Sequence, residues 1–125
     1  RTPPPPPRAL LERALVTAAR ETDGKALSAA LSLALRTYAG ALWRCDGAGL
    51  TPRELGLALR AAGAPDDERV ALLRLLDGLD ALRWAPAALP VERVAATLTD
   101  ARAWADAVEG RLAAATARSG GKDGQ

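Results

Sequence analysis

The sequence contains no histidine and only one cysteine, and these two scarcities exclude several kinds of chemistry. Without histidine there is no Ser-His-Asp triad and no imidazole base, and most transition-metal sites lose their commonest ligand. Cys45 has no second thiol with which to form a disulfide, and its neighbours Arg44 and Asp46 give no nucleophile signature. The sequence therefore favours a protein that is not an enzyme and that has no catalytic residue, metal ligand or cofactor.

Two further patterns support this exclusion. The glycines form neither of the phosphate-binding loops, GxxxxGK[ST] or GxGxxG after a strand. The acidic residues 66–68 lack the alternating spacing of a calcium-binding loop. Asp77 and Asp80 lie three apart on a predicted helix, and we interpret them as part of a solvated helix face rather than as paired catalytic carboxylates.

Aromatic residues and long apolar runs are also scarce. Only Tyr38, Trp43, Trp84 and Trp104 are aromatic, whereas Ala and Leu supply most of the 49% apolar content. Ala, Leu, Arg and Glu favour helices, and the β-branched and aromatic residues that strands prefer are few, so the composition predicts an all-α fold. No apolar run reaches the roughly 18 residues that a membrane span requires.

The 125 residues are the size of one domain, and their two ends differ in composition from the middle. Residues 1–7 include five consecutive prolines and predict a polyproline II spacer, with an SH3 or WW ligand as the alternative. Residues 118–125, RSGGKDGQ, predict a flexible tail. Between them, residues 8–117 predict a compact bundle of about five helices that follows the proline-rich stalk.

Apolar residues at helical spacing place the five helices. They are expected from 8 to 21, from 25 to about 44, from 51 to 63, from 66 to about 84, and from 91 to at least 112. The second helix has Leu27, Leu31, Leu35, Tyr38 and Leu42 along one stripe and is expected to be the longest central helix. The glycines that follow it are expected to provide its sharp exit.

The phrase LTPRE, residues 50–54, has two interpretations. Thr51 as N-cap, Pro52 at the first helical position and Glu54 at the third form a capping box, which makes Thr51 and Glu54 helix-capping residues. The same phrase often opens a LuxR-type helix-turn-helix, so a DNA-binding regulator domain is an alternative function. The next helix, however, begins with PDDE, which phosphates would repel, and the net charge is only +2. We therefore expect no nucleic acid among the partners.

The fifth predicted helix has an apolar seam whose positions are spaced alternately three and four residues apart. The seam consists of Val91, Val94, Leu98, Ala101, Ala105, Val108 and Leu112. Such a seam can form a coiled coil, so a self-associating structural domain is a further alternative. Because two of its seven positions are alanine, packing onto its own bundle is the favoured interpretation.

Three segments, taken in order, resemble a known bacterial family. They are LALRTYAGALW (33–43), LTPRELGLAL (50–59) and LLDGLDALRWAP (75–86). In order and spacing they resemble the cytoplasmic helical domain of BatD-like membrane proteins, which are usually encoded beside a MoxR-type AAA ATPase and von Willebrand factor A proteins. The matching residues are Leu35, Arg36, Tyr38, Thr51, Glu54, Leu55, Asp80, Arg83, Trp84 and Ala85. The family more often has Phe or Tyr where this chain has Trp84.

The resemblance implies a protein-interaction or scaffolding module that has no cofactor and works with a MoxR-type ATPase or a von Willebrand factor A protein. It also implies a membrane-spanning segment upstream of Arg1, with the domain tethered to the inner, cytoplasmic face of the cell membrane. Residues 1–44 carry seven basic and three acidic residues, an excess that anionic lipid would attract.

A tryptophan beside a two-proline loop is the strongest candidate for a partner contact, because aromatic anchors dominate binding hot spots. We predict that Arg83, Trp84 and Pro86 contact the partner. Asp80 and Arg83, three residues apart on a helix, are expected to pair on its surface.

Overall fold

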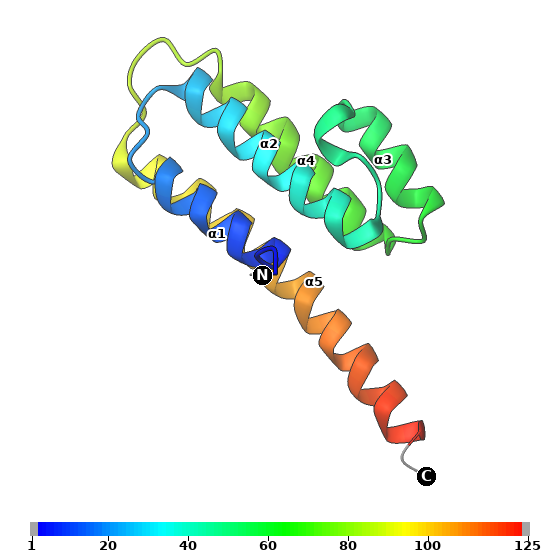
Figure 1. Cartoon of the computed structure of the whole chain (residues 1–125). Coiled ribbons are helices and arrows are strands. Elements are labelled where there is room, and N and C mark those ends of the chain that lie inside the picture. Colours follow the sequence, from blue (N-terminus) through cyan, green and yellow to red (C-terminus); the bar gives the residue numbers. More distant parts are fainter. Residues whose placement is uncertain (1–2, 124–125) are drawn as a thin grey trace.

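The computed structural model describes residues 3–123 of the chain, and the side chains of residues 3–119. All regular structure in that range is helical (Figure 1). The elements are α1 (Pro7–Ala18), α2 (Gly24–Trp43), the short 3-10 helix η1 (Gly47–Gly49), α3 (Pro52–Ala61), α4 (Asp66–Leu82) and α5 (Val91–Asp123). The α2 helix packs against both α1 and α4, and α4 packs against α3 and α5. The predicted all-α bundle of about five helices is confirmed.

The proline-rich start of the chain is shorter than expected, because its last proline belongs to a helix. Residues 3–6 have no regular structure, and Pro6 has the φ of −64° and ψ of 154° of polyproline II. Pro7 was predicted as part of the spacer but is the first residue of α1. Proline suits that position because the first N–H of a helix has no intrahelical acceptor. Residues 1–2 of the predicted spacer lie outside the described residues.

The turn between α1 and α2 is built by two acidic side chains. The α1 helix ends at Ala18 rather than at Glu21, as the sequence had predicted. The carboxylate of Glu21 accepts hydrogen bonds from the backbone N–H groups of Thr22 and Asp23, at 3.1 and 3.0 Å, and so stabilises the turn instead of a further helical turn. Asp23 is the N-cap of α2, and its carboxylate accepts from the N–H of Ala26 at 2.9 Å.

The exit from α2 depends on a residue that is not glycine, so the prediction that glycines provide it was wrong. Arg44, directly after Trp43, has a φ of 57° and a ψ of 50°, in the left-handed region. Gly47 is needed for a different reason. A Cβ at Gly47 would lie 1.9 Å from the carbonyl oxygen of Arg36, so only glycine lets η1 approach α2 this closely.

The start of α3 is the capping box that the sequence predicted. Thr51 Oγ1 accepts from the N–H of Glu54 at 3.2 Å, and the Glu54 carboxylate accepts from the N–H of Thr51 at 2.9 Å. The helix ends at Ala61, and Gly63 in the following turn has a φ of +87°. Three acidic residues then occupy the first turn of α4, where they favour the positive end of the helix dipole.

The longest helix is α5, at 33 residues, and α2, at 20 residues, is the longest of the four α-helices before it. In Figure 1 α5 extends well beyond the other helices. It includes residues 118–123, which had been predicted as part of a flexible tail, while 124–125 lie outside the described residues. The alanine-rich stretch 113–117 is a strong helix former, and propagating an existing helix costs little compared with nucleating one.

The apolar seam of α5 packs onto its own bundle over its five central positions. These positions are buried, whereas Val91 and Leu112 at the two ends are exposed. Trp104 is also buried, between Ala101 and Val108, and was not expected there. The favoured interpretation of the seam is therefore confirmed for its centre.

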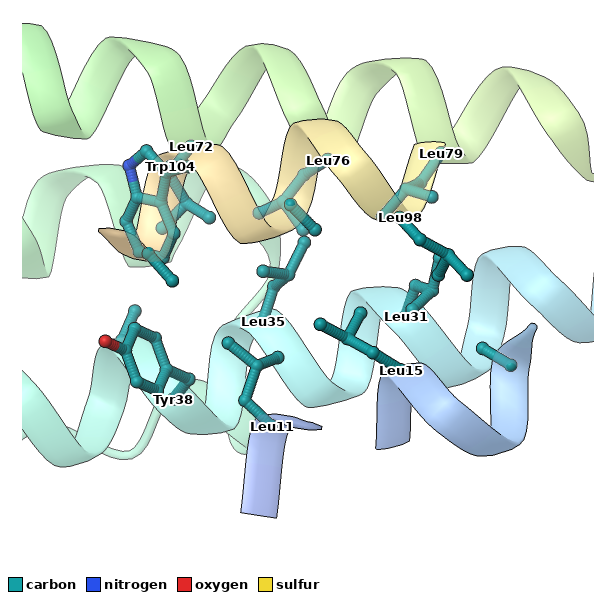
Figure 2. Packing of buried hydrophobic residues seen from close by; sticks show 14 of the residues in the cluster. Leu11, Leu15, Leu31, Leu35, Tyr38, Leu72, Leu76, Leu79, Leu98 and Trp104 are labelled. Atoms are coloured by element: carbon teal, nitrogen blue, oxygen red, sulfur yellow. The ribbon is translucent and has the colours of Figure 1, made fainter. Parts of the chain in front are cut away.

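A single leucine-rich core is formed by α1 to α5, with Leu55 and Leu59 as the contribution of α3. Figure 2 shows part of it. The residues labelled there are Leu11 and Leu15 from α1, Leu31, Leu35 and Tyr38 from α2, Leu72, Leu76 and Leu79 from α4, and Leu98 and Trp104 from α5. Truncating one such buried leucine to alanine typically costs about 2–5 kcal/mol. None of the helices within residues 3–123 combines the length and the apolarity needed to cross a bilayer.

Ion pairs join α1 to α5. Arg8 lies 2.7 Å from Asp106 and 3.3 Å from Glu109, and Glu12 lies 3.0 Å from Arg102. Burial alone would lower the pKa of Arg8, but its hydrogen bonds to Asp106 and Glu12 outweigh burial and raise the pKa. Burial would raise the pKa of Glu12, but the hydrogen bonds from Arg102 and Arg8 outweigh it and lower the pKa. Both shifts favour the charged forms, so the pairs persist at neutral pH.

Candidate interaction surface

The predicted partner-contact residues lie on the turn that follows α4. The backbone N–H groups of Arg83 and Trp84 donate to the carbonyls of Asp80 and Ala81, each at 3.3 Å, so the two residues continue the end of the helix. Pro86 follows on the same connection and is exposed. The three predicted residues therefore lie on one exposed turn between α4 and α5.

Trp84 is the most prominent side chain of this turn, with 74% of its surface exposed. The guanidinium carbon of Arg83 lies 5.1 Å from the centre of its ring, within the range of a cation-π interaction. Arg83 Nη1 also lies 3.3 Å from Asp80 Oδ1, which confirms the predicted pair. Asp80 thus positions Arg83, and Arg83 restricts the ring of Trp84. An anchor that is already positioned loses less conformational entropy on binding.

The segment between α4 and α5, which includes Trp84, contacts the turn between α1 and α2. Leu89 is buried, and its N–H donates to the carbonyl of Thr22 at 2.8 Å. At Gly24, the first residue of α2, an added Cβ would lie 2.1 Å from the carbonyl oxygen of Leu82. The backbone therefore packs closely on both sides of Trp84, at Leu82 and at Leu89, and these contacts hold the Trp84 turn against this end of the bundle.

Thr51 and Glu54, the other residues singled out from the sequence, have the helix-capping geometry described above. The hydrogen bond from the backbone N–H of Thr51 lowers the pKa of Glu54. Both side chains are exposed at the start of α3. They are not part of the turn that carries Trp84.

A groove of about 980 Å³ lies between α2 and α4 and is bordered by the start of α3. We call it the α2–α4 groove. Its charged lining residues are Lys25, Arg36, Arg53, Arg83, Asp77 and Asp80. Sequence reasoning did not find this groove, because its charges come from three helices and only tertiary packing brings them together.

A second groove, of about 720 Å³, lies between α4 and α5. Its exposed charged residues are balanced in sign, with Arg74 and Arg93 against Asp67 and Asp100. It therefore favours neither an acidic nor a basic ligand.

A partly buried polar cluster links α2, α4 and α5 at the end of the bundle opposite Trp84. The ring of Trp104 lies edge-on to Tyr38, 5.8 Å between centroids, and its Nε1 donates to the carbonyl of Glu68 at 2.9 Å. Arg111 donates to both carboxylate oxygens of Glu68, and the Tyr38 hydroxyl donates to the carboxylate of Glu109. Burial, and then this hydrogen bond to Glu109, raise the pKa of Tyr38.

The residues of this cluster satisfy one another, and we interpret it as a structural element rather than as a reaction centre. Sequence reasoning had treated Glu68 only as a helix-dipole residue and had missed Trp104. The spacing of Trp104 from Ala101 and Val108, three and four residues, was a signal that could have placed it in the seam. No group of three or more His, Cys, Asp or Glu residues within 3–123 could hold a metal ion.

The alternative DNA-binding interpretation concerns α3 and α4, which are consecutive helices joined by a short turn. The helix that would approach DNA, α4, begins with the exposed Asp66 and Asp67 and buries Leu72, Leu76 and Leu79 in the core. Its exposed acidic start opposes contact with phosphate. DNA binding stays an alternative, and salt-dependent binding of a duplex by the domain is its test.

No family model, no curated protein sequence and no solved structure matches the chain. The resemblance to BatD-like proteins therefore depends only on the three segments quoted for it.

Proposed function

We propose that the protein is a non-enzymatic interaction or scaffolding module that binds a protein partner through Trp84. The observation that carries the proposal is that Trp84 is 74% exposed, on a turn that backbone contacts hold against the start of α2. Large exposed aromatic side chains are unfavourable in water and are characteristic of binding hot spots. Arg83 and Pro86 beside it would complete the contact.

The energy available from such a contact is substantial. A buried tryptophan covers about 150–250 Å², and each apolar Å² removed from water contributes about 25 cal/mol. Covering the exposed part of Trp84 would therefore contribute about 3 kcal/mol before any polar contact is counted. That amount is in the range of a hot-spot residue.

The resemblance to BatD-like proteins suggests the partner. We propose a MoxR-type ATPase or a von Willebrand factor A protein, with the domain tethered to the inner face of the cell membrane by a segment outside these 125 residues. This part of the proposal rests on analogy with the family alone.

Co-purification from the native host with a Trp84→Ala variant tests the proposal. We expect the unchanged chain to retain the partner and the variant to lose it, with both proteins equally folded by circular dichroism. Leu57→Ala is the matched control, because Leu57 is 63% exposed on α3 and lies outside the Trp84 turn. Equal capture by the Trp84→Ala variant would overturn the assignment of the site, and repeated recovery without either protein class would overturn the assignment of the partner.

Self-association is a second candidate, favoured by the part of α5 that extends beyond the bundle (Figure 1). After Val108 no side chain up to residue 119 is buried, and Leu112 at the next seam position is 37% exposed. Sedimentation at several concentrations, with Leu112→Glu as the comparison, distinguishes the two. A mass that is independent of concentration would exclude self-association over the range measured.

A further inference from the structure

The α2–α4 groove carries an excess of positive charge. Arg83 is paired with Asp80, but Lys25, Arg36 and Arg53 have no carboxylate within ion-pair distance among the described residues. Asp77 is the one lining carboxylate outside an ion pair in the same range. Three uncompensated cations against one carboxylate favour a ligand with negative charge.

Arg36 is the best positioned of these cations. Its Nε donates to the carbonyl and the hydroxyl of Ser32 at 3.2 and 3.1 Å, and its Nη1 donates to the carbonyls of Ala48 and Leu50, each at 3.0 Å. All four acceptors are neutral, so they hold the half-buried guanidinium in place without neutralising it. A carboxylate would supply the missing charge, and a guanidinium that is already held loses little entropy when it binds one.

The floor of the groove is apolar. Leu33 of α2 is 49% exposed there, and Leu50 and Leu73 are half-buried beside it. From Lys25 to Arg36 the groove follows α2 for about 17 Å, or roughly three helical turns. A leucine floor beside the cations of α2 and of the start of α3 is complementary to a short helix with one apolar stripe and acidic residues that face those cations.

We propose that the α2–α4 groove binds an acidic amphipathic helix. This inference rests on the proposed function, because the helix would belong to the partner that Trp84 anchors. Arg83 connects the two surfaces, since it stacks on Trp84 and also lines the groove. The partner helix would pass from Trp84, past Lys25, to Arg36 and the start of α3.

Two synthetic peptides of about 14 residues provide the test. Both have the same leucine and alanine stripe, and one carries glutamate on the flanks where the other carries lysine. We expect the acidic peptide to shift the backbone NMR signals of residues 25–36 and 73–80, with an affinity that falls as salt rises. We expect no binding of the lysine peptide at the same concentrations.

Charge reversal locates the binding site. Lys25→Glu with Arg53→Glu should weaken the acidic peptide about tenfold or more. Arg13→Glu with Arg20→Glu makes the same change of net charge at exposed positions of α1 and of the turn that follows it, and should leave the affinity within about twofold. Equal effects of the two double variants, equal binding of both peptides, no binding of the acidic peptide, or shifts that map to the α4–α5 groove would each overturn the inference.

The Trp84→Ala variant separates this inference from the proposed function. If native partner capture is lost on Trp84→Ala but not on the double reversal of Lys25 and Arg53, the groove inference fails and the Trp84 site stands. If the double reversal abolishes binding of peptide and partner while Trp84→Ala changes neither, the groove stands and the Trp84 site fails.

Discussion

Replacing Arg111 by alanine should destabilise the protein more than removing the charge of its partner, Glu68. The side chain of Glu68 is only 8% exposed, whereas that of Arg111 is 36% exposed. Without Arg111 the carboxylate is left buried without a cation, and breaking a fully buried pair costs about 3–5 kcal/mol. Because the missing guanidinium would leave an opening to solvent, we discount this to about 2–3 kcal/mol for Arg111→Ala.

Removing the charge of Glu68 should lower the unfolding free energy less than removing Arg111 does. In Glu68→Gln the shape is kept and Arg111 can turn toward water, so we expect a loss of about 1 kcal/mol. Equilibrium urea unfolding followed by circular dichroism measures both changes. At this chain length 1 kcal/mol corresponds to roughly 4 °C in Tm, so Arg111→Ala should lower Tm by about 10 °C.

Arg118→Ala is the control on the same helix, because Arg118 is exposed and forms no ion pair among the described residues. It should change the unfolding free energy by less than about 0.5 kcal/mol. A Glu68→Gln loss equal to or larger than the Arg111→Ala loss would refute the reasoning, since the buried carboxylate would then not be the costly member of the pair.

Three further predictions concern α2 and its exit. The single tyrosine, Tyr38, has an ordinary pKa of 10.0 that burial and the bond to Glu109 raise. Its contribution to stability is complete below pH 10 and is lost as the pH rises above it, so tyrosinate absorbance should appear together with unfolding; ionisation near pH 10 in the folded protein would contradict this. Gly47→Ala should destabilise by about 3 kcal/mol in urea unfolding, because its Cβ would collide with backbone, and a loss under about 1 kcal/mol would show that η1 can move away. Arg44→Gly should stabilise by about 0.5–1 kcal/mol in the same assay, since glycine adopts a positive φ without strain, and any loss would mean that the Arg44 side chain contributes more than its strain costs.

Features that depend on neighbouring residues were predictable from the sequence. The capping box of Thr51 and Glu54 requires only four consecutive residues, and the pair of Asp80 and Arg83 requires one helical turn. The apolar stripe predicted four buried positions of α2, because the helix presents one apolar face whatever it packs against; they are Leu27, Leu31, Leu35 and Tyr38. The all-helical bundle follows from these local patterns.

Features that depend on tertiary packing were not predictable. Arg44 adopts a left-handed conformation because the close approach of η1 to α2 requires the chain to turn there, and no local pattern marks an arginine for that role. Glu68 is buried because Arg111, 43 residues later, reaches its carboxylate. The α2–α4 groove likewise exists only after three helices have packed, whereas the exposure of Trp84 could be anticipated from its place beside two prolines.

Two kinds of interaction hold α1 against its neighbours: apolar packing and ion pairs. The contact between α1 and α2 is made of leucine and does not depend on ionic strength. The link between α1 and α5 includes the ion pairs of Arg8 with Asp106 and Glu109 and of Arg102 with Glu12. At about 1 M sodium chloride the screening length falls to roughly 3 Å, so these ion pairs weaken. Sulfate at the same ionic strength also strengthens apolar burial. The identity of the anion, and not only its concentration, therefore determines whether concentrated salt only weakens the link between α1 and α5 or also strengthens the apolar core that the two helices share.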